Sequence, residues 1–209
     1  IADHLYHYDI RAAVATRLTN SAGAKREATF SPDGRTVAFV KSNNLYVTAV
    51  ASPAERPLTT DGNAGLLNGV LDWVYSEELY GRGIHRGYWW SPDSSSLAFI
   101  QLDETQVPEY TLVDDIPYRP AIERWDYPKA GDPNPTARLG IVSTSGDPAR
   151  WIDTSRYVDF LIVNVGWTPD SLAVIYQIQD RQQTWLDLNR AERASGTTST
   201  LLKETSRTW

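Results

Sequence analysis

One pattern occurs three times in the sequence, and it limits the possible folds more than any other feature. Each copy has an aromatic residue, then Ser or Thr, Pro and Asp, and then a run of apolar residues that favour strands; the copies lie at residues 30–40, 90–100 and 167–176. In a tight turn, Pro sets φ at the second position, Asp is tolerated at the third, and Gly or Ser closes the turn. The aromatic residue therefore ends one strand, and the apolar run forms the next, buried strand.

A second hairpin is predicted after each of these turns. The segments that supply it are residues 45–59, 137–152 and 185–202, and the opening stretch, residues 5–19, has the pattern of the last half of an earlier copy. Four-stranded sheets that recur with aromatic and turn residues indicate a β-propeller. We expect an all-β fold in which residues 1–209 form a partial propeller of about three and a half antiparallel, four-stranded blades, with a short helical insertion. The alternative is a β-sandwich whose turns match by coincidence.

The copies lie further apart than compact blades require. The intervals from Phe30 to Trp90 and from Trp90 to Trp167 both exceed the roughly 40–50 residues of a compact blade. Each interval is therefore expected to hold an insertion. Three and a half copies are also too few to close a ring of about 4–8 blades. Because the sequence contains no methionine, we expect it to be a piece of a longer protein.

Composition excludes several classes of protein. The chain has 26 acidic and 20 basic residues and a net charge of −6, which disfavours binding to nucleic acid. No apolar run approaches the roughly 18 residues that a membrane span needs. Cysteine is absent, which rules out disulfides, thiolate zinc sites and cysteine nucleophiles. No motif requires a metal ion or a cofactor, and neither is expected.

The first insertion, predicted at residues 61–87, carries two adjacent carboxylates. Asp72 is suited to cap a helix and Gly81 to follow its end, which predicts a helix of about two turns between glycine-rich ends. Glu77 and Glu78 are adjacent on this helix, about 100° apart around its axis. They are placed to flank a single cation from neighbouring sides. The alternative is a solvated acidic surface, but loops held on rigid scaffolds commonly carry function.

The basic residues and histidines of the sequence add little to this site. Arg82 and Arg86 follow the acidic pair, and we interpret them as neutralising it; the alternative is contact with carbonyl groups of a ligand. The sequence has no Gly-x-Ser-x-Gly nucleophile motif, and its last histidine is His85. A hydrolase triad of the order Ser, Asp, His needs a histidine after the nucleophile. We therefore assign no catalytic residue to this chain.

Several segments together resemble one family. Residues 72–79 (DWVYSEEL) and 89–93 (WWSPD) closely resemble the propeller domain of dipeptidyl peptidase IV, within the prolyl oligopeptidase family. Residues 97–108 and 127–136 support the resemblance. The tail, including residues 204–209, is similar to the bacterial members.

The resemblance implies an eight-bladed propeller joined to a C-terminal α/β-hydrolase domain that carries a Ser-Asp-His triad. Members remove dipeptides from peptide N-termini and prefer Pro or Ala as the second residue. By this resemblance Glu77 and Glu78 grip the α-amine of the substrate, and Ser76 stands where the family often has a third acid. The family's substrate-binding arginine falls at or before Ile1 and is not assigned.

Further expectations follow from the resemblance. The parent protein is expected to be a serine-type dipeptidyl peptidase, and this chain alone is expected to be inactive. Its expected partners are the substrate N-terminus, the hydrolase domain of the same parent chain and a second copy in a homodimer. The expected location is outside the cytoplasm of a bacterium, either periplasmic or secreted. The alternative function is a non-catalytic propeller that binds other proteins.

Overall fold

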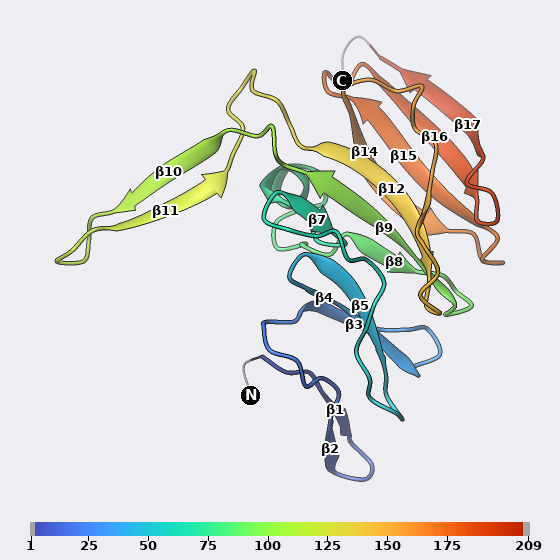
Figure 1. Ribbon diagram of the computed structural model, residues 1–209. Helices are drawn as coiled ribbons and strands as arrows, with labels where there is room; N and C mark the ends of the chain where they lie inside the picture. Colours follow the sequence, from blue (N-terminus) through green and yellow to red (C-terminus); the bar gives the residue numbers. More distant parts are fainter. Residues whose placement is uncertain (1–2, 207–209) are drawn as a thin grey trace.

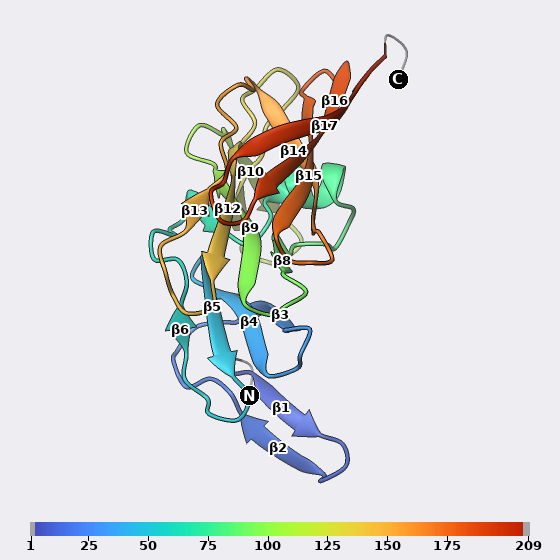
Figure 2. The same ribbon diagram turned by 90° about the vertical axis from the view of Figure 1, so that its right-hand side faces the viewer.

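The chain folds into a series of antiparallel sheets that follow one another along the sequence. A computed structural model describes residues 3–206, so the tail residues 207–209, part of the resemblance, lie outside the described residues. The first sheet is the hairpin of β1 (Tyr6–Asp9) and β2 (Val14–Arg17). From this hairpin at the bottom of Figure 1, the sheets succeed one another to the top, and Figure 2 shows the same order from the side.

Three larger sheets follow the hairpin, one for each copy of the sequence pattern. The first contains β3 (Arg26–Phe30), β4 (Thr36–Lys41), β5 (Asn44–Ala49) and β6 (Arg56–Pro57) in that order. The last contains β14 (Phe160–Trp167), β15 (Ala173–Asp180), β16 (Trp185–Glu192) and β17 (Thr198–Thr205). In both, each strand pairs with the next one along the chain, as the predicted successive hairpins require.

The middle sheet has an interrupted edge. It contains β7 (Leu66–Asn68), β8 (Tyr88–Trp90), β9 (Ser96–Asp103), β12 (Thr136–Ser143) and β13 (Arg150–Trp151). β7 and β8 pair with successive parts of β9, since Asn68 lies opposite Gln101 and Tyr88 lies opposite Phe99. The two short strands therefore act as one edge strand, and the sheet keeps a four-stranded layout.

The core lies between the sheets. The apolar run of each sequence copy becomes the second strand of its sheet, and nearly all of β9 is buried. Phe39 in β4 and Phe99 in β9 are fully buried. Such strands are apolar on both faces because sheets pack against both of them. This explains why the sequence shows continuous apolar runs there and not an alternation.

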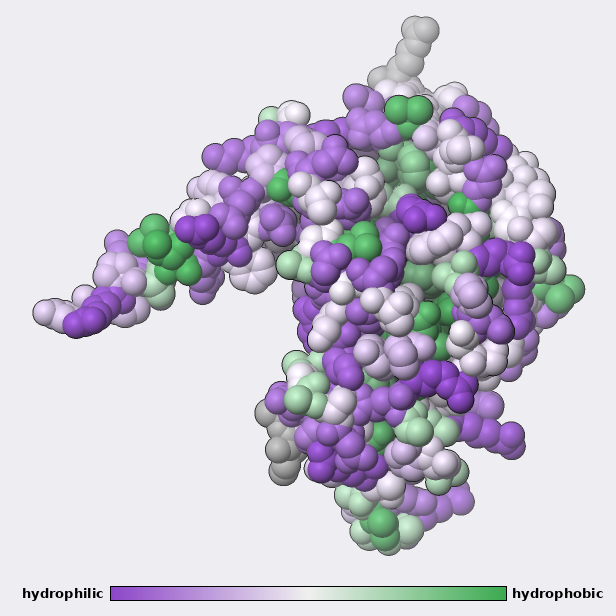
Figure 3. All heavy atoms as spheres, in the orientation of Figure 1, coloured by the Kyte–Doolittle hydropathy of each residue, from purple (hydrophilic) through white to green (hydrophobic). Residues whose placement is uncertain are grey.

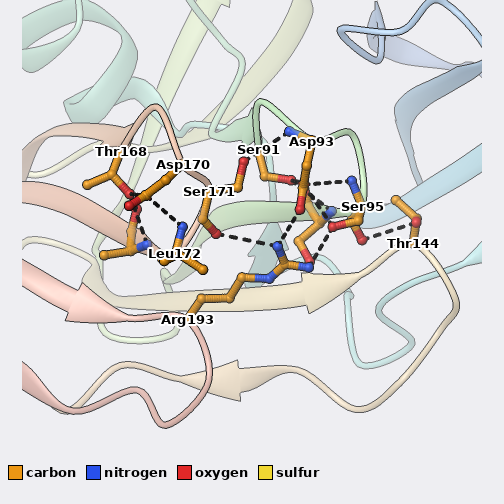
Figure 4. A network of polar contacts seen from close by, with 11 residues as sticks. Ser91, Asp93, Ser95, Thr144, Thr168, Asp170, Ser171, Leu172 and Arg193 are labelled. Carbon is orange, nitrogen blue, oxygen red and sulfur yellow. Dashed lines mark hydrogen bonds and ion pairs between the residues drawn. The ribbon is translucent and has the colours of Figure 1, made fainter.

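The Ser/Thr-Pro-Asp segments form the predicted turns. In each copy the residue after Asp donates its N–H to the carbonyl of the residue before Pro, at 2.8–2.9 Å. The hydroxyl of the Ser or Thr donates to the Asp carboxylate, at 2.6 Å in all three copies. The second and third turns lie next to each other in Figure 4, where Arg193 extends from the third sheet to Asp93, with 2.7 Å between its Nη1 and Oδ2.

The second long interval holds a projecting hairpin. β10 (Glu109–Asp114) and β11 (Ala121–Asp126) pair only with each other and extend away from the other sheets as an arm (Figure 1). The sequence predicts an insertion in this interval but does not indicate its shape. No helix within residues 3–206 is long and apolar enough to cross a membrane.

Candidate functional site

The helical excursion leaves the middle sheet through a narrow neck. Gly69 donates its N–H to the carbonyl of Ile100 at 2.9 Å, and Ile100 donates to the carbonyl of Gly87 at 2.8 Å. Gly87 closes the neck by donating to the carbonyl of Gly69 at 3.0 Å. The excursion itself is therefore residues 70–86, and the predicted interval of residues 61–87 also contains strand β7.

Both neck positions favour glycine. Gly69 has φ +70°, a conformation that other residues adopt only with strain. A Cβ on Gly87 would lie 2.9 Å from Leu71 Cδ2 and 3.3 Å from the backbone carbon of Gly69. The absence of side chains therefore allows the two halves of the edge strand to meet.

The excursion carries a short π-helix, Val74–Leu79. The sequence predicts a helix of about two turns here, and it does not predict the π-winding. Tyr80 donates its N–H to the carbonyl of Tyr75, five residues back, at 2.9 Å, so the winding is wider than that of an α-helix. Gly81 follows with φ +102°, in the predicted terminating role.

Asp72 fulfils its predicted capping role. Its carboxylate accepts the backbone N–H groups of Val74, at 3.1 Å, and of Tyr75, at 3.0 Å. These bonds satisfy donors that have no partner inside the helix. Asp72 is itself buried, and this burial raises the pKa of its carboxyl group despite the two bonds.

Two aromatic residues attach the helix to its surroundings. Tyr75 is fully buried, and its hydroxyl oxygen accepts the N–H of Ile162 in β14 at 3.3 Å. The ring of Trp73 packs on Tyr127, which follows the arm, with 4.3 Å between the ring centroids. The helix is therefore held from two sides while it stands out beyond β8, away from β13 (Figure 2).

Glu77 lies toward the turn that follows the helix. Its Oε2 is 3.4 Å from Nε of Arg82, and the Glu77 side chain is 30% exposed. Arg86 lies elsewhere, with its guanidinium 6.0 Å from the ring centroid of Tyr88. Of the two arginines, Arg82 is therefore the one that takes the predicted neutralising position.

Glu78 is exposed and borders a cavity of about 280 Å³ between the helix, the loop after the arm and the third sheet. The apolar part of the lining includes Leu79 and Leu161, and Lys129 and Arg181 contribute cations. Arg181 is held in place because its Nη2 donates to the carbonyl of Asp132 at 2.6 Å. The two glutamates therefore lie in different environments. Glu77 lies beside the guanidinium of Arg82, and Glu78 lies at the edge of a cavity.

Sequence reasoning misses a buried acid near the start of the helix. Glu104, in the loop after β9, is only 9% exposed. Burial, together with the nearby charges of Asp72 and Asp126, raises the pKa of its carboxyl group to about 8. No local signal in the sequence marks Glu104, because its neighbours come from the excursion and from the arm.

Comparison with known proteins identifies the family. Residues 1–209 match the family model described as the dipeptidyl peptidase IV (DPP IV) N-terminal region. The chain belongs to this family.

Curated relatives of this DPP IV region include fungal peptidases. A probable dipeptidyl peptidase 4 of Aspergillus clavatus is 34% identical over 183 residues, which cover 81% of this chain and 23% of the relative. The dipeptidyl aminopeptidase B of Saccharomyces cerevisiae is 32% identical over 188 residues, covering 86% of this chain and 22% of the relative. The chain spans less than a quarter of these relatives.

Solved bacterial structures share the fold. The crystal structure of Porphyromonas gingivalis dipeptidyl peptidase 4 has a TM-score of 0.87 and 30% identity, covering 97% of this chain and 29% of that one. A putative dipeptidyl aminopeptidase IV from Bacteroides ovatus has a TM-score of 0.79 at 23% identity, covering 100% of this chain and 28% of that one, which shows the fold alone. The predicted all-β propeller fold is confirmed. A bacterial type remains a prediction, because the curated relatives described above are fungal.

Proposed function

We propose that residues 1–209 are a partial propeller domain of a serine-type dipeptidyl peptidase, which removes N-terminal dipeptides with Pro or Ala as the second residue. In this proposal Glu77 and Glu78 hold the α-ammonium group of the substrate. The observation that carries it is the position of both glutamates on one short helix, with Glu78 exposed and Glu77 30% exposed, in a chain of the DPP IV family.

The chemistry of a peptide N-terminus fits this pair. An α-amino group has a pKa of about 7.7–8.0, so most peptide N-termini are positively charged at neutral pH. An ammonium group has three N–H donors, and its bonds to carboxylates are among the stronger hydrogen bonds in proteins. Two extended residues span only about 7 Å. An anchored ammonium therefore determines which peptide bond reaches a nucleophile at a set distance.

The nucleophile belongs, in this proposal, to a partner domain. The 209 residues contain no Gly-x-Ser-x-Gly motif, and the relatives are much longer than this chain. We place the Ser-Asp-His triad on a C-terminal α/β-hydrolase domain of the same protein and expect this chain alone to be inactive. The location that we propose is outside the cytoplasm of a bacterium.

A homodimer is also part of the proposal, and the arm supports it. Val113 and Ile122 lie opposite each other on the arm and are both 62% exposed. Ile116 and Tyr118, between the two strands, are almost fully exposed. Figure 3 shows this apolar surface on the projecting arm. A second copy of the chain that packs on the arm would remove this surface from water.

Steady-state hydrolysis by the full-length protein tests the site. Glu77→Gln and Glu78→Gln should each raise KM for a free-amine dipeptide substrate with Pro second by about 10- to 100-fold, the range for one charged hydrogen bond. Glu123→Gln on the exposed arm is the matched control and should leave KM unchanged. Wild-type protein should not cleave the same substrate when its N-terminus is acetylated.

Two outcomes would contradict the proposal. Equal turnover of acetylated and free-amine substrates would show that binding does not depend on the ammonium group. A wild-type protein that binds free-amine peptides without cleaving them would favour the alternative, a non-catalytic propeller that binds proteins.

A further inference from the structure

Arg82 is an exposed cation beside Glu77, in the turn that follows the helix. It lies between Gly81 and Gly83, which have φ +102° and +83°. Its side chain is 91% exposed, and a Cβ built on Gly83 would meet no heavy atom within 4 Å. The exposed Arg82 side chain therefore has room in the solvent to move away from Glu77.

The contact between Arg82 and Glu77 occupies the same carboxylate that the proposed function gives to the substrate. The guanidinium Nε lies 3.4 Å from Oε2 of Glu77. A substrate ammonium needs carboxylate oxygens of the same kind, and two cations on one carboxylate repel each other. A peptide N-terminus that binds Oε2 of Glu77 therefore competes with Arg82 for that oxygen.

We propose that Arg82 is an internal competitor of the substrate α-ammonium, which occupies Glu77 in the free protein and is displaced when a peptide binds. This inference rests on the proposed function and adds a residue that sets substrate affinity. An exposed ion pair is weak, so the displacement lowers peptide affinity only slightly. Arg82 thereby keeps one of the two carboxylates neutralised until a peptide N-terminus arrives.

Arg86 provides a matched control in the same excursion. It carries the same charge, but its guanidinium lies over the ring of Tyr88, and its backbone bridges to Val70 beside the neck. Removing Arg86 changes the net charge of the excursion as much as removing Arg82 does. Only the removal of Arg82 frees the Glu77 carboxylate.

The test is steady-state kinetics of the full-length protein on a chromogenic free-amine dipeptide with Pro second. Arg82→Ala and Arg82→Gln should lower KM by about two- to fivefold, the range for an exposed ion pair, with kcat unchanged. Arg86→Ala should leave KM within the error of the wild type. In a Glu77→Gln background, Arg82→Ala should no longer lower KM.

The outcomes separate this inference from the proposed function. If Glu77→Gln raises KM while Arg82→Ala leaves it unchanged, Arg82 is no competitor, and the ammonium site stands. If Arg82→Ala raises KM, Arg82 contacts the substrate, and the inference is overturned. An equal fall of KM in Arg86→Ala would show that the effect comes from the net charge of the excursion, and it would also overturn the inference. If Glu77→Gln and Glu78→Gln both leave KM unchanged, the proposed site itself fails.

Discussion

The backbone N–H of Asp93 donates a hydrogen bond of 3.0 Å to the hydroxyl of Ser171, across the boundary between the middle and third sheets. The same bond, from Asp33 to Ser94 at 3.1 Å, crosses the boundary between the first and middle sheets. Both serines have φ above +60°, a backbone conformation that is strained for residues other than glycine. The hydroxyl offsets this strain because it links each turn to the turn of the previous sheet.

Substitution at Ser171 should separate the two effects. Ser171→Ala keeps the strained backbone and loses the acceptor, so the free energy of unfolding should fall by about 1–2 kcal/mol. Ser171→Gly loses the same acceptor but removes the strain, so its loss should be smaller. Denaturant unfolding of the full-length protein measures both values. An alanine variant that is more stable than the glycine variant would show that the strain is unimportant.

Gly87→Ala should damage the neck of the excursion. The new methyl group would displace Leu71 or the backbone of Gly69, which should cost about 1–3 kcal/mol of unfolding free energy. It should also raise KM for free-amine dipeptides, because the neck carries the helix with Glu77. Gly166→Ala is the control, since a Cβ there meets no atom within 4 Å, and it should change neither quantity. Wild-type KM in the Gly87 variant would show that the neck does not position the helix.

Glu104 should make the protein less stable at alkaline pH. Its folded-state pKa of about 8 lies above the ordinary value of 4.5, so the folded state holds the proton more tightly than the unfolded state does. Stability from this group is complete below about pH 4.5 and is lost as the pH rises toward 8.

The loss should be on the order of 3–5 kcal/mol by pH 9, and Glu104→Gln should abolish it. Chemical denaturation of both proteins at pH 5, 7 and 9 measures the difference. The expectation fails if the two proteins lose stability in parallel between pH 5 and pH 9.

The arm should mediate self-association. Val113→Asp places a charge in the exposed apolar surface of the arm, so a homodimer should dissociate into monomers, as judged by light scattering after size-exclusion chromatography. Val14→Asp in the first hairpin, where the valine is also exposed, should leave the oligomeric state unchanged. A dimer that survives Val113→Asp would exclude this surface of the arm as the interface.

Much of the site could be predicted because it is local. The capping role of Asp72, the end of the helix at Gly81 and the pairing of Arg82 with the acidic residues all involve residues within one short segment. The π-winding of the helix was not predictable in this way, because it accompanies the burial of Tyr75 against β14. Arg181, which lines the same cavity as Glu78, follows strand β15 of the third sheet, and no spacing in the sequence reveals that the two residues share a cavity.

The turns and the buried strands follow from local sequence alone, because the φ of proline and the apolar character of a strand act within a few residues. The fold class and the existence of insertions followed from repetition of that local pattern. Three features follow only from the packing of distant segments: β7 and β8 form one edge strand, Asp93 bonds to a residue 78 positions away, and the pKa of Glu104 is raised. Each of these features depends on backbone groups or charges that lie far apart in the sequence. They come into contact only when the sheets pack against one another.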